Sequence, residues 1–264
     1  QYSENWQISK KWQILNKGLR MCANYTPVTR ADRLLQYFGV QRGRDEPDHD
    51  TFPMGLAPFI RLAPSDTSPG EMTRFVDDGI FRFVPDFVTK LDWARKTYNA
   101  RSETVDVKPT YKGAWAAGHR CIIPAEAIYE PNYQSGKSVR WRIRKANSEP
   151  MGIAGIYRTW TNVDGEGVFA MSMLTVNADD HPFMRQFHAP DDEKRMVVIL
   201  DPEEFEGWLT CSVAEAKNRY CKQWHGQLVG EPAPLPARPR SAKTASRAHP
   251  KGPPAGKGPS GELF

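Results

Sequence analysis

The chain has 264 residues, 39% of them hydrophobic and 25% charged, and its formal net charge at pH 7 is +5. This length supports one substantial core, and the 22 prolines, the 8 tryptophans and the short apolar runs argue against a simple helical bundle. The four cysteines form no Cys-x-x-Cys pair and no apolar run reaches about 18 residues, so a zinc finger, a disulfide scaffold and a membrane-spanning helix are not expected.

The positive charge is concentrated at the two ends of the chain. Residues 233–264 hold six basic side chains and one acidic one, and residues 1–20 hold four basic and one acidic. Residues 21–232 carry 26 basic and 29 acidic groups, so any nucleic-acid site there must be a local patch. The cysteine usage and the lack of a signal-peptide core favour a reducing, cytoplasmic location with no membrane partner.

Composition divides the chain into three parts. Residues 1–21 are interpreted as a leader, a tag or an upstream translated segment, or else as a pro-segment whose removal frees the next residue. Residues 22–231 are predicted to form one domain. Residues 232–264 are rich in Pro, Gly, Ala, Ser and basic side chains, which is typical of a disordered basic tail.

The central part is predicted to be rich in strands. A helix is expected to open at residues 29–32, with Leu34, Leu35 and Phe38 on its apolar face and Gly39 as its stop. Residues 52–63 indicate an irregular strand or a sheet edge, because two prolines interrupt them. Further strands are predicted at residues 80–84, 121–123, 139–144, 151–157, 168–176 and 196–200. Two capped helices should begin at Asp201 and Ser212, completing a strand-rich α+β domain without regular βαβ alternation.

Met21-Cys22 is a candidate reactive centre. Loss of Met21 would leave Cys22 as an N-terminal residue that carries both a thiol and an α-amine. An amine condenses with an aldehyde to a Schiff base, and an adjacent thiol can then close on the imine carbon to give a thiazolidine ring. Cys22 is therefore a candidate aldehyde trap, and the alternative is an ordinary small, buried hydrophobic residue.

Three further segments contain residues suited to acid–base or polar chemistry. Asn99 and Arg101 lie in a polar stretch, residues 98–104, that indicates either a site or a solvated loop. Glu130 follows an apolar strand and is either a half-buried base or a paired surface acid. His188 lies among aromatic residues, where a histidine serves either as a hydrogen-bonded structural residue or as a general acid or base.

One local basic feature could bind nucleic acid. On a strand, Arg140, Arg142 and Arg144 project from one face, with Trp141 and Ile143 on the other. This arrangement fits either a phosphate-binding row or an edge strand whose charges prevent aggregation. A second candidate, Phe87, could stack on a base or belong to the core.

No cofactor or metal is indicated by the motifs. The sequence has no Gly-rich phosphate loop, no Ser elbow and no His-Glu-x-x-His segment. His119 near Cys121, and Cys221 near His225, are isolated pairs without the second half of a metal site.

Several short motifs follow one another in an informative order. They are Met21-Cys22, Gly55-Leu56-Ala57-Pro58, Phe83-Val84-Pro85, Asn99 to Thr104, Cys121 through Tyr129-Glu130, Ala154 to Tyr157, Leu174-Thr175, and His188 followed by Arg195-Met196. This ordered set resembles the SRAP family, the SOS-response-associated peptidases whose members shield abasic sites in single-stranded DNA. The segment from Asn99 to Thr104 reproduces the family's N-A-R-x-E-T letter for letter.

The resemblance implies a fold, a partner and an activity. It implies an α+β domain built on a strand-rich pseudo-barrel with flanking helices, acting as a monomer on single-stranded DNA that contains abasic sites, and nucleoid-associated when DNA is damaged. Carried over by position, Cys22 would attack the ring-opened sugar aldehyde and Asn99 would orient the amine and the sugar. Glu130 would handle protons during imine formation, His188 would assist ring opening and crosslink reversal, and Arg101 would hold phosphate.

The chain departs from the family pattern in four places. The family's Cys-Gly-Arg is Cys22-Ala23-Asn24, so an arginine beside the nucleophile is missing. Its compact H-D-R-M-P is stretched between His188 and Arg195, and its paired tryptophans are replaced at Phe87-Val88. While the 21 residues before Cys22 remain, the nitrogen of Cys22 is an amide that cannot form an imine.

Two other functions remain open from the sequence. One is a thiol peptidase in which Cys22, His188 and Asn99 act as nucleophile, base and orienting group, and which removes residues 1–21 itself. The other is a non-covalent binding module for single-stranded DNA that uses residues 140–144 and the basic tail.

Overall fold

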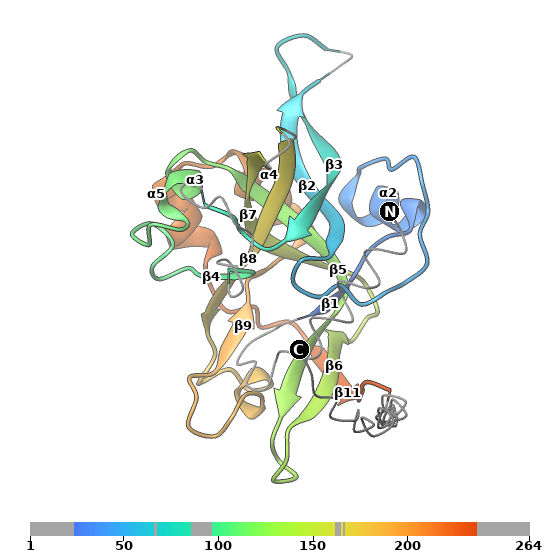
Figure 1. Ribbon diagram of the computed structural model, residues 1–264, viewed down its shortest axis with the longest axis vertical. Coiled ribbons are helices and arrows are strands. Elements are labelled where there is room, and N and C mark those ends of the chain that lie inside the picture. The colour runs from blue at the N-terminus through green and yellow to red at the C-terminus, as the bar shows by residue number, and fades with distance from the viewer. Residues whose placement is uncertain (1–23, 66–67, 86–96, 162–164, 166, 237–264) are drawn as a thin grey trace, which may run out of the picture. The chain divides into compact units, whose positions relative to one another are not determined.

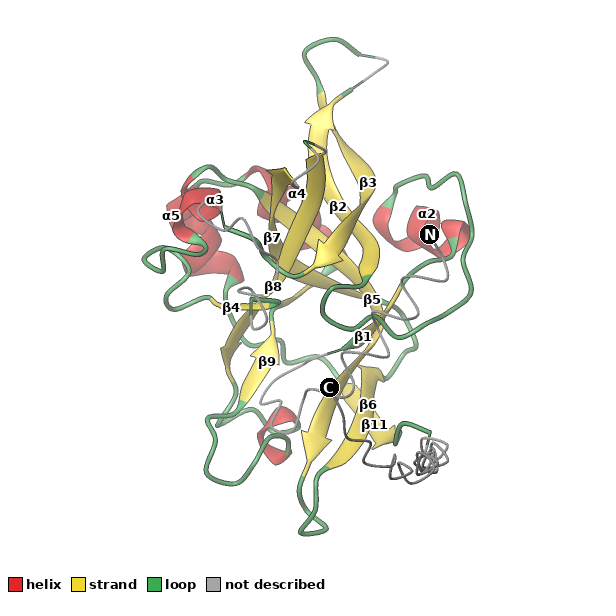
Figure 2. Ribbon diagram, viewed as in Figure 1, coloured by secondary structure: helices red, strands yellow, loops and turns green. Residues whose placement is uncertain are grey.

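Strands rather than helices form the framework of the protein (Figures 1 and 2). The computed structural model describes residues 24–65, 68–85, 97–161, 165 and 167–236. Contacts divide the chain into one unit of residues 1–234 and a second of residues 235–264, and every described strand and helix belongs to the first unit. No helix in the described residues has the length and apolar character needed to span a membrane.

Five strands close into a barrel. They are β2 (Leu56–Pro64), β3 (Met72–Phe81), β5 (Arg120–Asn132), β7 (Met151–Thr161) and β8 (Gly167–Asn177). The strands run in the order β7, β8, β3, β2, β5, and the ring closes because β5 also pairs with β7. The predicted strand-rich α+β fold with a pseudo-barrel and flanking helices is therefore confirmed.

Close packing of β7 against its neighbours depends on glycine. A Cβ atom at Gly155 would lie 2.9 Å from both Cys121 Sγ and Ile123 Cδ1. At Gly152 it would lie 2.3 Å from a ring carbon of Phe205. Both separations are shorter than van der Waals contact, so these glycines allow β5 and a covering aromatic ring to approach β7.

The strand β5 continues beyond the barrel and carries further strands on both edges. Its second half pairs with β1 (Tyr25–Pro27) on one edge and with β6 (Val139–Lys145) on the other, and β11 (Leu228–Pro232) pairs with β6. The interpretation of residues 139–144 as an edge strand is therefore wrong, because β6 has a partner on each side. The edge interpretation of residues 52–63 is also wrong, because β2 pairs with β3 along its length and with β5 at Ile60.

The end of β8 gathers two short strands that the site uses. β4 (Asn99–Arg101) runs parallel to β8, with Arg101 opposite Thr175. β9 (Arg195–Val197) runs antiparallel to β8, with Val197 opposite the same threonine. The run predicted as one strand at residues 196–200 is split, and its second part, β10 (Ile199–Leu200), pairs with β7 instead.

The helices are short and lie outside the barrel (Figure 2). α2 (Ala31–Phe38) ends at Gly39, whose φ of 66° gives the expected left-handed stop. Leu34 and Phe38 are buried as predicted, but Leu35 is 53% exposed. Leu34 and Phe38 are four residues apart and lie on the same side of the helix, whereas Leu35 lies beside this narrow buried stripe. The remaining helical segments are α3 (Lys112–Ala116), η2 (Met184–Gln186), η3 (Pro202–Glu204), α4 (Phe205–Thr210), α5 (Val213–Glu215) and η4 (Ala216–Tyr220).

Both predicted helix caps are present. The backbone N–H of Asp201 donates to Glu204 Oε2 at 3.1 Å, which is the reach-back half of a capping box. The backbone N–H of Glu215 donates to Ser212 Oγ at 3.2 Å. These bonds hold η3, α4 and α5 in place after β10.

Candidate functional site

Two distant segments of the chain dock on the same edge of β5, on either side of Glu130. The backbone N–H of Tyr129 donates to the carbonyl oxygen of Asn24 at 3.3 Å. Two residues further along β5, the carbonyl oxygen of Pro131 accepts from the backbone N–H of His188 at 2.8 Å. The segment that follows Cys22 in sequence and the segment that carries His188 therefore meet at Glu130.

Glu130 and His188 form a buried pair of titratable side chains. Each residue is only 2% exposed, and Nδ1 of His188 lies 3.6 Å from Glu130 Oε2. That separation is too long for a hydrogen bond. The sequence predicted a half-buried Glu130, but its side chain is almost fully buried because the residue lies in the interior of a paired strand.

The orientation of the His188 ring is set by a backbone carbonyl. Nε2 of His188 lies 2.9 Å from the carbonyl oxygen of Arg195. A carbonyl can only accept a hydrogen bond, so the hydrogen resides on Nε2 and the lone pair of Nδ1 faces Glu130. Burial lowers the pKa of His188, which favours the neutral ring at pH 7. Nδ1 is therefore a proton acceptor.

The backbone of His188 is held in an unusual conformation. Its φ of 67° lies in the left-handed region, which a side chain other than glycine adopts at an energetic cost. The residue before it, Phe187, is fully buried and packs edge-on against Trp141 at a centroid distance of 6.0 Å. This packing and the bond to Pro131 keep His188 in that conformation.

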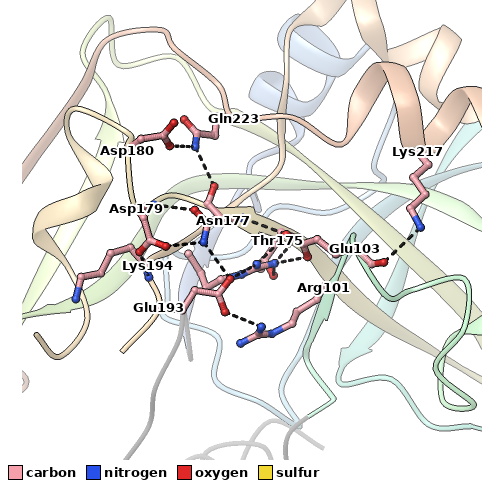
Figure 3. Close-up of polar contacts among 11 residues, drawn as sticks. Arg101, Glu103, Thr175, Asn177, Asp179, Asp180, Glu193, Lys194, Lys217 and Gln223 are labelled. Atoms are coloured by element: carbon pink, nitrogen blue, oxygen red, sulfur yellow. Dashed lines mark hydrogen bonds and ion pairs between the residues drawn. The ribbon is translucent and has the colours of Figure 1, made fainter. Parts of the chain in front are cut away.

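A network of ion pairs joins β4, β8 and β9 next to this pair (Figure 3). Arg195 of β9 is 2% exposed, and its guanidinium binds both carboxylate oxygens of Glu103, at 2.8 and 2.9 Å. The same group donates to the carbonyl oxygen of Thr175 at 2.8 Å and to Glu193 at 2.8 Å. Glu193 in turn pairs with Arg101 at 2.6 Å, so Arg101 of β4 is linked to the buried Arg195.

The stretch between His188 and Arg195 loops out without separating the two residues. Within this loop, residues 189–194, the backbone N–H of Lys194 donates to Asp179 Oδ1 at 2.8 Å, and Glu193 accepts from Asn177 Nδ2 at 3.1 Å. Figure 3 shows Asn177, Asp179 and Glu193 side by side. The longer spacing relative to the family's H-D-R-M-P is accommodated in the loop, and His188 still contacts the backbone of Arg195.

Asn99 lies in β4 rather than in a solvated loop. It is 5% exposed, pairs with Met173 of β8, and its carbonyl oxygen accepts from the Tyr111 hydroxyl at 3.0 Å. The loop interpretation of residues 98–104 is wrong for Asn99–Arg101, because parallel pairing with β8 makes them a strand, whereas residues 102–104 form a turn. Arg101, in the same strand, remains 49% exposed at its side chain.

The arginine row of β6 lies on the face opposite Glu130. Glu130 is directly opposite Trp141 across the β5–β6 pair, and Tyr129 is opposite Arg142. Directly paired residues project from the same face of a sheet, so Glu130 shares its face with Trp141. The predicted alternation of arginines with Trp141 and Ile143 is present. The arginines project from the face of the sheet that does not carry Glu130.

Each arginine of this row has a partner. The guanidinium of Arg140 lies 3.4 Å from the centroid of the Tyr129 ring and forms an ion pair with Asp50. Arg142 lies 3.8 Å from Glu231, and Arg144 donates to the Ser148 hydroxyl at 3.3 Å. Their role in DNA binding stays a prediction.

Two candidates, Cys22 and Phe87, lie outside the described residues. The three cysteines that are described are poor nucleophiles at neutral pH. Burial raises the pKa of Cys121 and of Cys211, and raises that of Cys221 to about 12. The described residues hold no group of three or more His, Cys, Asp or Glu side chains suited to a metal ion.

Sequence reasoning did not recognise the contribution of Arg195 and Glu103. Arg195 was indicated only as part of the motif in which His188 is followed by Arg195-Met196, and as a basic side chain directly before the apolar run of residues 196–200. Glu103 belongs to the segment that matches the family's N-A-R-x-E-T, and nothing in the sequence indicates that it pairs with a residue 92 positions away.

Comparison with known proteins identifies the family. The family model described as SOS response associated peptidase (SRAP) matches residues 21–230, which is most of the chain. The chain belongs to the SRAP family. The SRAP match begins at Met21, the residue before Cys22, and includes Glu130, His188 and the ion-pair network.

Relatives with assigned names are similar over most of this SRAP chain. The abasic site processing protein YoqW of Bacillus subtilis is 25% identical over 198 residues, which cover 72% of this chain and 80% of YoqW. The abasic site processing protein HMCES of Gallus gallus is 27% identical over 207 residues, which cover 68% of this chain and 59% of HMCES.

A solved structure supports the SRAP fold. The crystal structure of a protein from Bordetella bronchiseptica is 35% identical and superposes with a TM-score of 0.72, covering 81% of this chain and all of that one. The fold is therefore shared with an experimentally determined structure.

Proposed function

We propose that this SRAP-family protein processes abasic sites in single-stranded DNA by forming a covalent thiazolidine crosslink through Cys22. The relatives named above are abasic site processing proteins, which supports the substrate class. The observation that carries the proposal for this chain is the meeting of Asn24, His188 and Glu130 on one edge of β5.

Chain connectivity supports a position of Cys22 close to this pair. Two peptide units separate Cys22 from Asn24, and an extended chain spans at most about 3.6 Å per residue, so their Cα atoms are within about 7 Å of each other. Asn24 is bonded to Tyr129, the residue adjacent to Glu130 in β5. In this proposal the amine and the thiol of Cys22 lie near Glu130 and His188.

The proposed reaction joins the two ends of Cys22 to one carbon. The α-amine adds to the aldehyde carbon of the ring-opened sugar, and the resulting carbinolamine loses water to give an imine. The thiol then adds to the imine carbon, its proton passes to the nitrogen, and the ring closes. One C–N bond and one C–S bond form, and one molecule of water leaves.

Glu130 and His188 supply the proton transfers in this proposal. Loss of water requires a proton at the departing hydroxyl, and sugar-ring opening requires removal of a proton from the anomeric hydroxyl and delivery of one to the ring oxygen. We assign the proton transfer that accompanies loss of water to Glu130. We assign the transfers of sugar-ring opening to His188, whose Nδ1 can accept a proton. Asn99 orients the amine and the sugar in this scheme.

The remaining groups would hold the DNA strand. Arg101 is half-exposed and beside the network, so it is the phosphate contact in this proposal. Phe87 is proposed to stack on a base. Arg140, Arg142 and Arg144 would bind the phosphate backbone on the other face of β6, away from Glu130.

The reaction requires that the amine of Cys22 be free. An α-amine has a pKa of roughly 7.7 to 8.0, so a sizeable fraction is unprotonated near neutral pH. A chain that begins at Met21 and loses this residue meets the requirement. The family's description as a peptidase favours a second reaction at the same site, in which Cys22 and His188 remove the preceding residues.

The test uses a protein that begins at Met21 and a single-stranded oligonucleotide with one abasic site. We expect a product that migrates more slowly in a denaturing gel, because the crosslink is covalent. Cys22→Ala should abolish it. Cys22→Ala and Cys22→Ser both retain the α-amine but form no thiazolidine, so each should give at most an imine that is lost on heating. Equal yields from the parental and Cys22→Ala proteins would contradict the proposal.

A further inference from the structure

Arg195 is a buried cation that the structure compensates with several partners. Its side chain is 2% exposed in β9. A buried guanidinium without partners is strongly destabilising, and a bidentate carboxylate is its best-matched partner. Glu103 provides that bidentate contact, while Glu193 and the carbonyl oxygen of Thr175 bind the same guanidinium at 2.8 Å.

The same residue binds His188 through its backbone. The carbonyl oxygen of Arg195 accepts from Nε2 of His188 at 2.9 Å. This carbonyl is fixed twice, because Arg195 pairs with Asn177 in the β8–β9 ladder and its side chain is tied to Glu103 on the chain segment after β4. A shift of Arg195 would therefore move the group that orients the imidazole.

The position of this carbonyl decides which ring nitrogen carries the hydrogen. With the bond to Arg195 intact, the hydrogen is on Nε2 and Nδ1 can accept a proton. If the bond is lost, the ring can carry its hydrogen on Nδ1, which lies 3.6 Å from Glu130 Oε2. In that tautomer Nδ1 donates toward the carboxyl group and no longer accepts.

We infer that Glu103 and Arg195 act as a positioning pair that holds His188 in the tautomer with Nδ1 as proton acceptor. The pair itself does not touch the reacting atoms. Its catalytic consequence rests on the function proposed above, whereas the tautomer can be observed without DNA.

The charges around His188 predict the direction of a pH effect. Glu130 faces the ring from β5, Arg195 adjoins it from β9, and Asp192 and Lys194 act from the loop between them. Burial lowers the pKa of His188, and the positive charges of Lys194 and Arg195 lower it further. Removing the charge of Glu103 leaves Arg195 less compensated. The acid limb of the pH–rate profile should therefore move to lower pH.

The experiment compares Glu103→Gln with the parental protein, both beginning at Met21. Asp106→Asn is the matched control, because Asp106 is another acid of the same segment and pairs with Lys217 at 2.6 Å. Nitrogen NMR of protein labelled with ¹⁵N-histidine reports the His188 tautomer, and single-turnover crosslinking between pH 5 and 8 reports the rate.

The parental protein and the control should show a protonated Nε2 and an unprotonated Nδ1. Glu103→Gln should show a mixture of tautomers, a crosslinking rate at least about tenfold lower, and an acid limb at lower pH. Glu103→Asp keeps the charge and should recover part of the rate. An unchanged tautomer and pH profile in Glu103→Gln would overturn the inference.

A second variant tests the Glu103–Arg195 contact if the first one does not fold. If Glu103→Gln does not fold, Arg195→Lys tests the same contact, because lysine keeps the charge and the backbone carbonyl but cannot bind a carboxylate with two parallel bonds. The same mixture of tautomers is expected, and the parental tautomer alone would overturn the inference. If the parental protein forms no crosslink, the proposed function fails while the NMR comparison still decides the positioning pair.

Discussion

At the scale of single residues, the proposed function centres on the buried pair formed by Glu130 and His188. Both side chains are almost fully buried, yet their facing atoms are 3.6 Å apart and not hydrogen-bonded to each other. In the proposed function, Glu130 and His188 each exchange a proton with the substrate. The lowered pKa of His188 keeps its ring neutral near pH 7, which is the form that accepts a proton.

Replacing Glu130 with glutamine tests its proton transfer. Glutamine has nearly the same shape but cannot exchange a proton, so Glu130→Gln should slow crosslinking roughly 100-fold or more. Glu126→Gln is the control, because Glu126 lies in the same strand and pairs with Arg33. Single-turnover rates with an abasic oligonucleotide provide the measurement. A parental rate for Glu130→Gln would remove this residue from the mechanism.

The sequence indicates Glu130 and His188 one at a time, but not their contact. The two residues come together because two segments dock on the edge of β5, and such long-range pairing leaves no local pattern. The role of Arg195 was still harder to predict, because a basic residue before an apolar strand usually faces solvent. Its burial depends on Glu103, which sequence alone could not assign as a partner.

At the scale of elements, the loop of residues 189–194 supplies an ion-pair partner to Arg101. The carboxylate of Glu193 in this loop lies 2.6 Å from the guanidinium of Arg101, which would bind a DNA phosphate in the proposed function. Figure 3 shows Arg101 directed toward Glu193 at the border of the network. A phosphate must therefore displace a carboxylate that the fold already supplies.

Glu193→Gln should strengthen the binding of intact single-stranded DNA. An exposed ion pair contributes about 0.2 to 1 kcal/mol, so its loss should improve affinity by up to about fivefold. Asp191→Asn removes the same charge from the same loop and serves as the control. Fluorescence anisotropy in a Cys22→Ala background avoids crosslinking. Affinity that is unchanged, or raised equally by both substitutions, would argue against competition for Arg101.

Strand positions were more predictable than strand partners. The runs at residues 139–144, 151–157 and 168–176 are confirmed as parts of β6, β7 and β8, because β-branched residues bounded by turns mark strands locally. The edge assignments failed because neither proline nor charge reveals whether another strand lies alongside. β4 was missed because a polar, three-residue strand has no alternation to detect.

At the scale of the whole molecule, the fold combines a closed barrel with added strands, and the barrel strands β5 and β8 also carry residues of the candidate site. Five strands form the barrel, and the extension of β5 beyond it positions Glu130 between the docked segments. The fold class could be predicted from the strand-rich pattern and the resemblance to the SRAP family. Ring closure depends on the β5–β7 pairing, which no single segment encodes.

The basic residues after position 234 are proposed to assist DNA binding without contributing to the folded unit. Residues 235–264 hold six basic side chains and one acidic one. A chain that ends at Pro234 should bind single-stranded DNA more weakly and with a shallower dependence on salt, because fewer counterions are released. Its thermal unfolding should match that of the longer chain. An unchanged salt dependence, or a lowered melting temperature, would contradict this division of the molecule.

The central claim is tested most directly by the intact mass of the product formed between the Met21-start protein and an abasic oligonucleotide. A thiazolidine predicts the summed masses of the protein that has lost Met21 and of the oligonucleotide, less one molecule of water. Treatment with borohydride should leave that mass unchanged, because the ring contains no C=N bond to reduce. Absence of an adduct, or an adduct that survives in Cys22→Ala, would contradict the account.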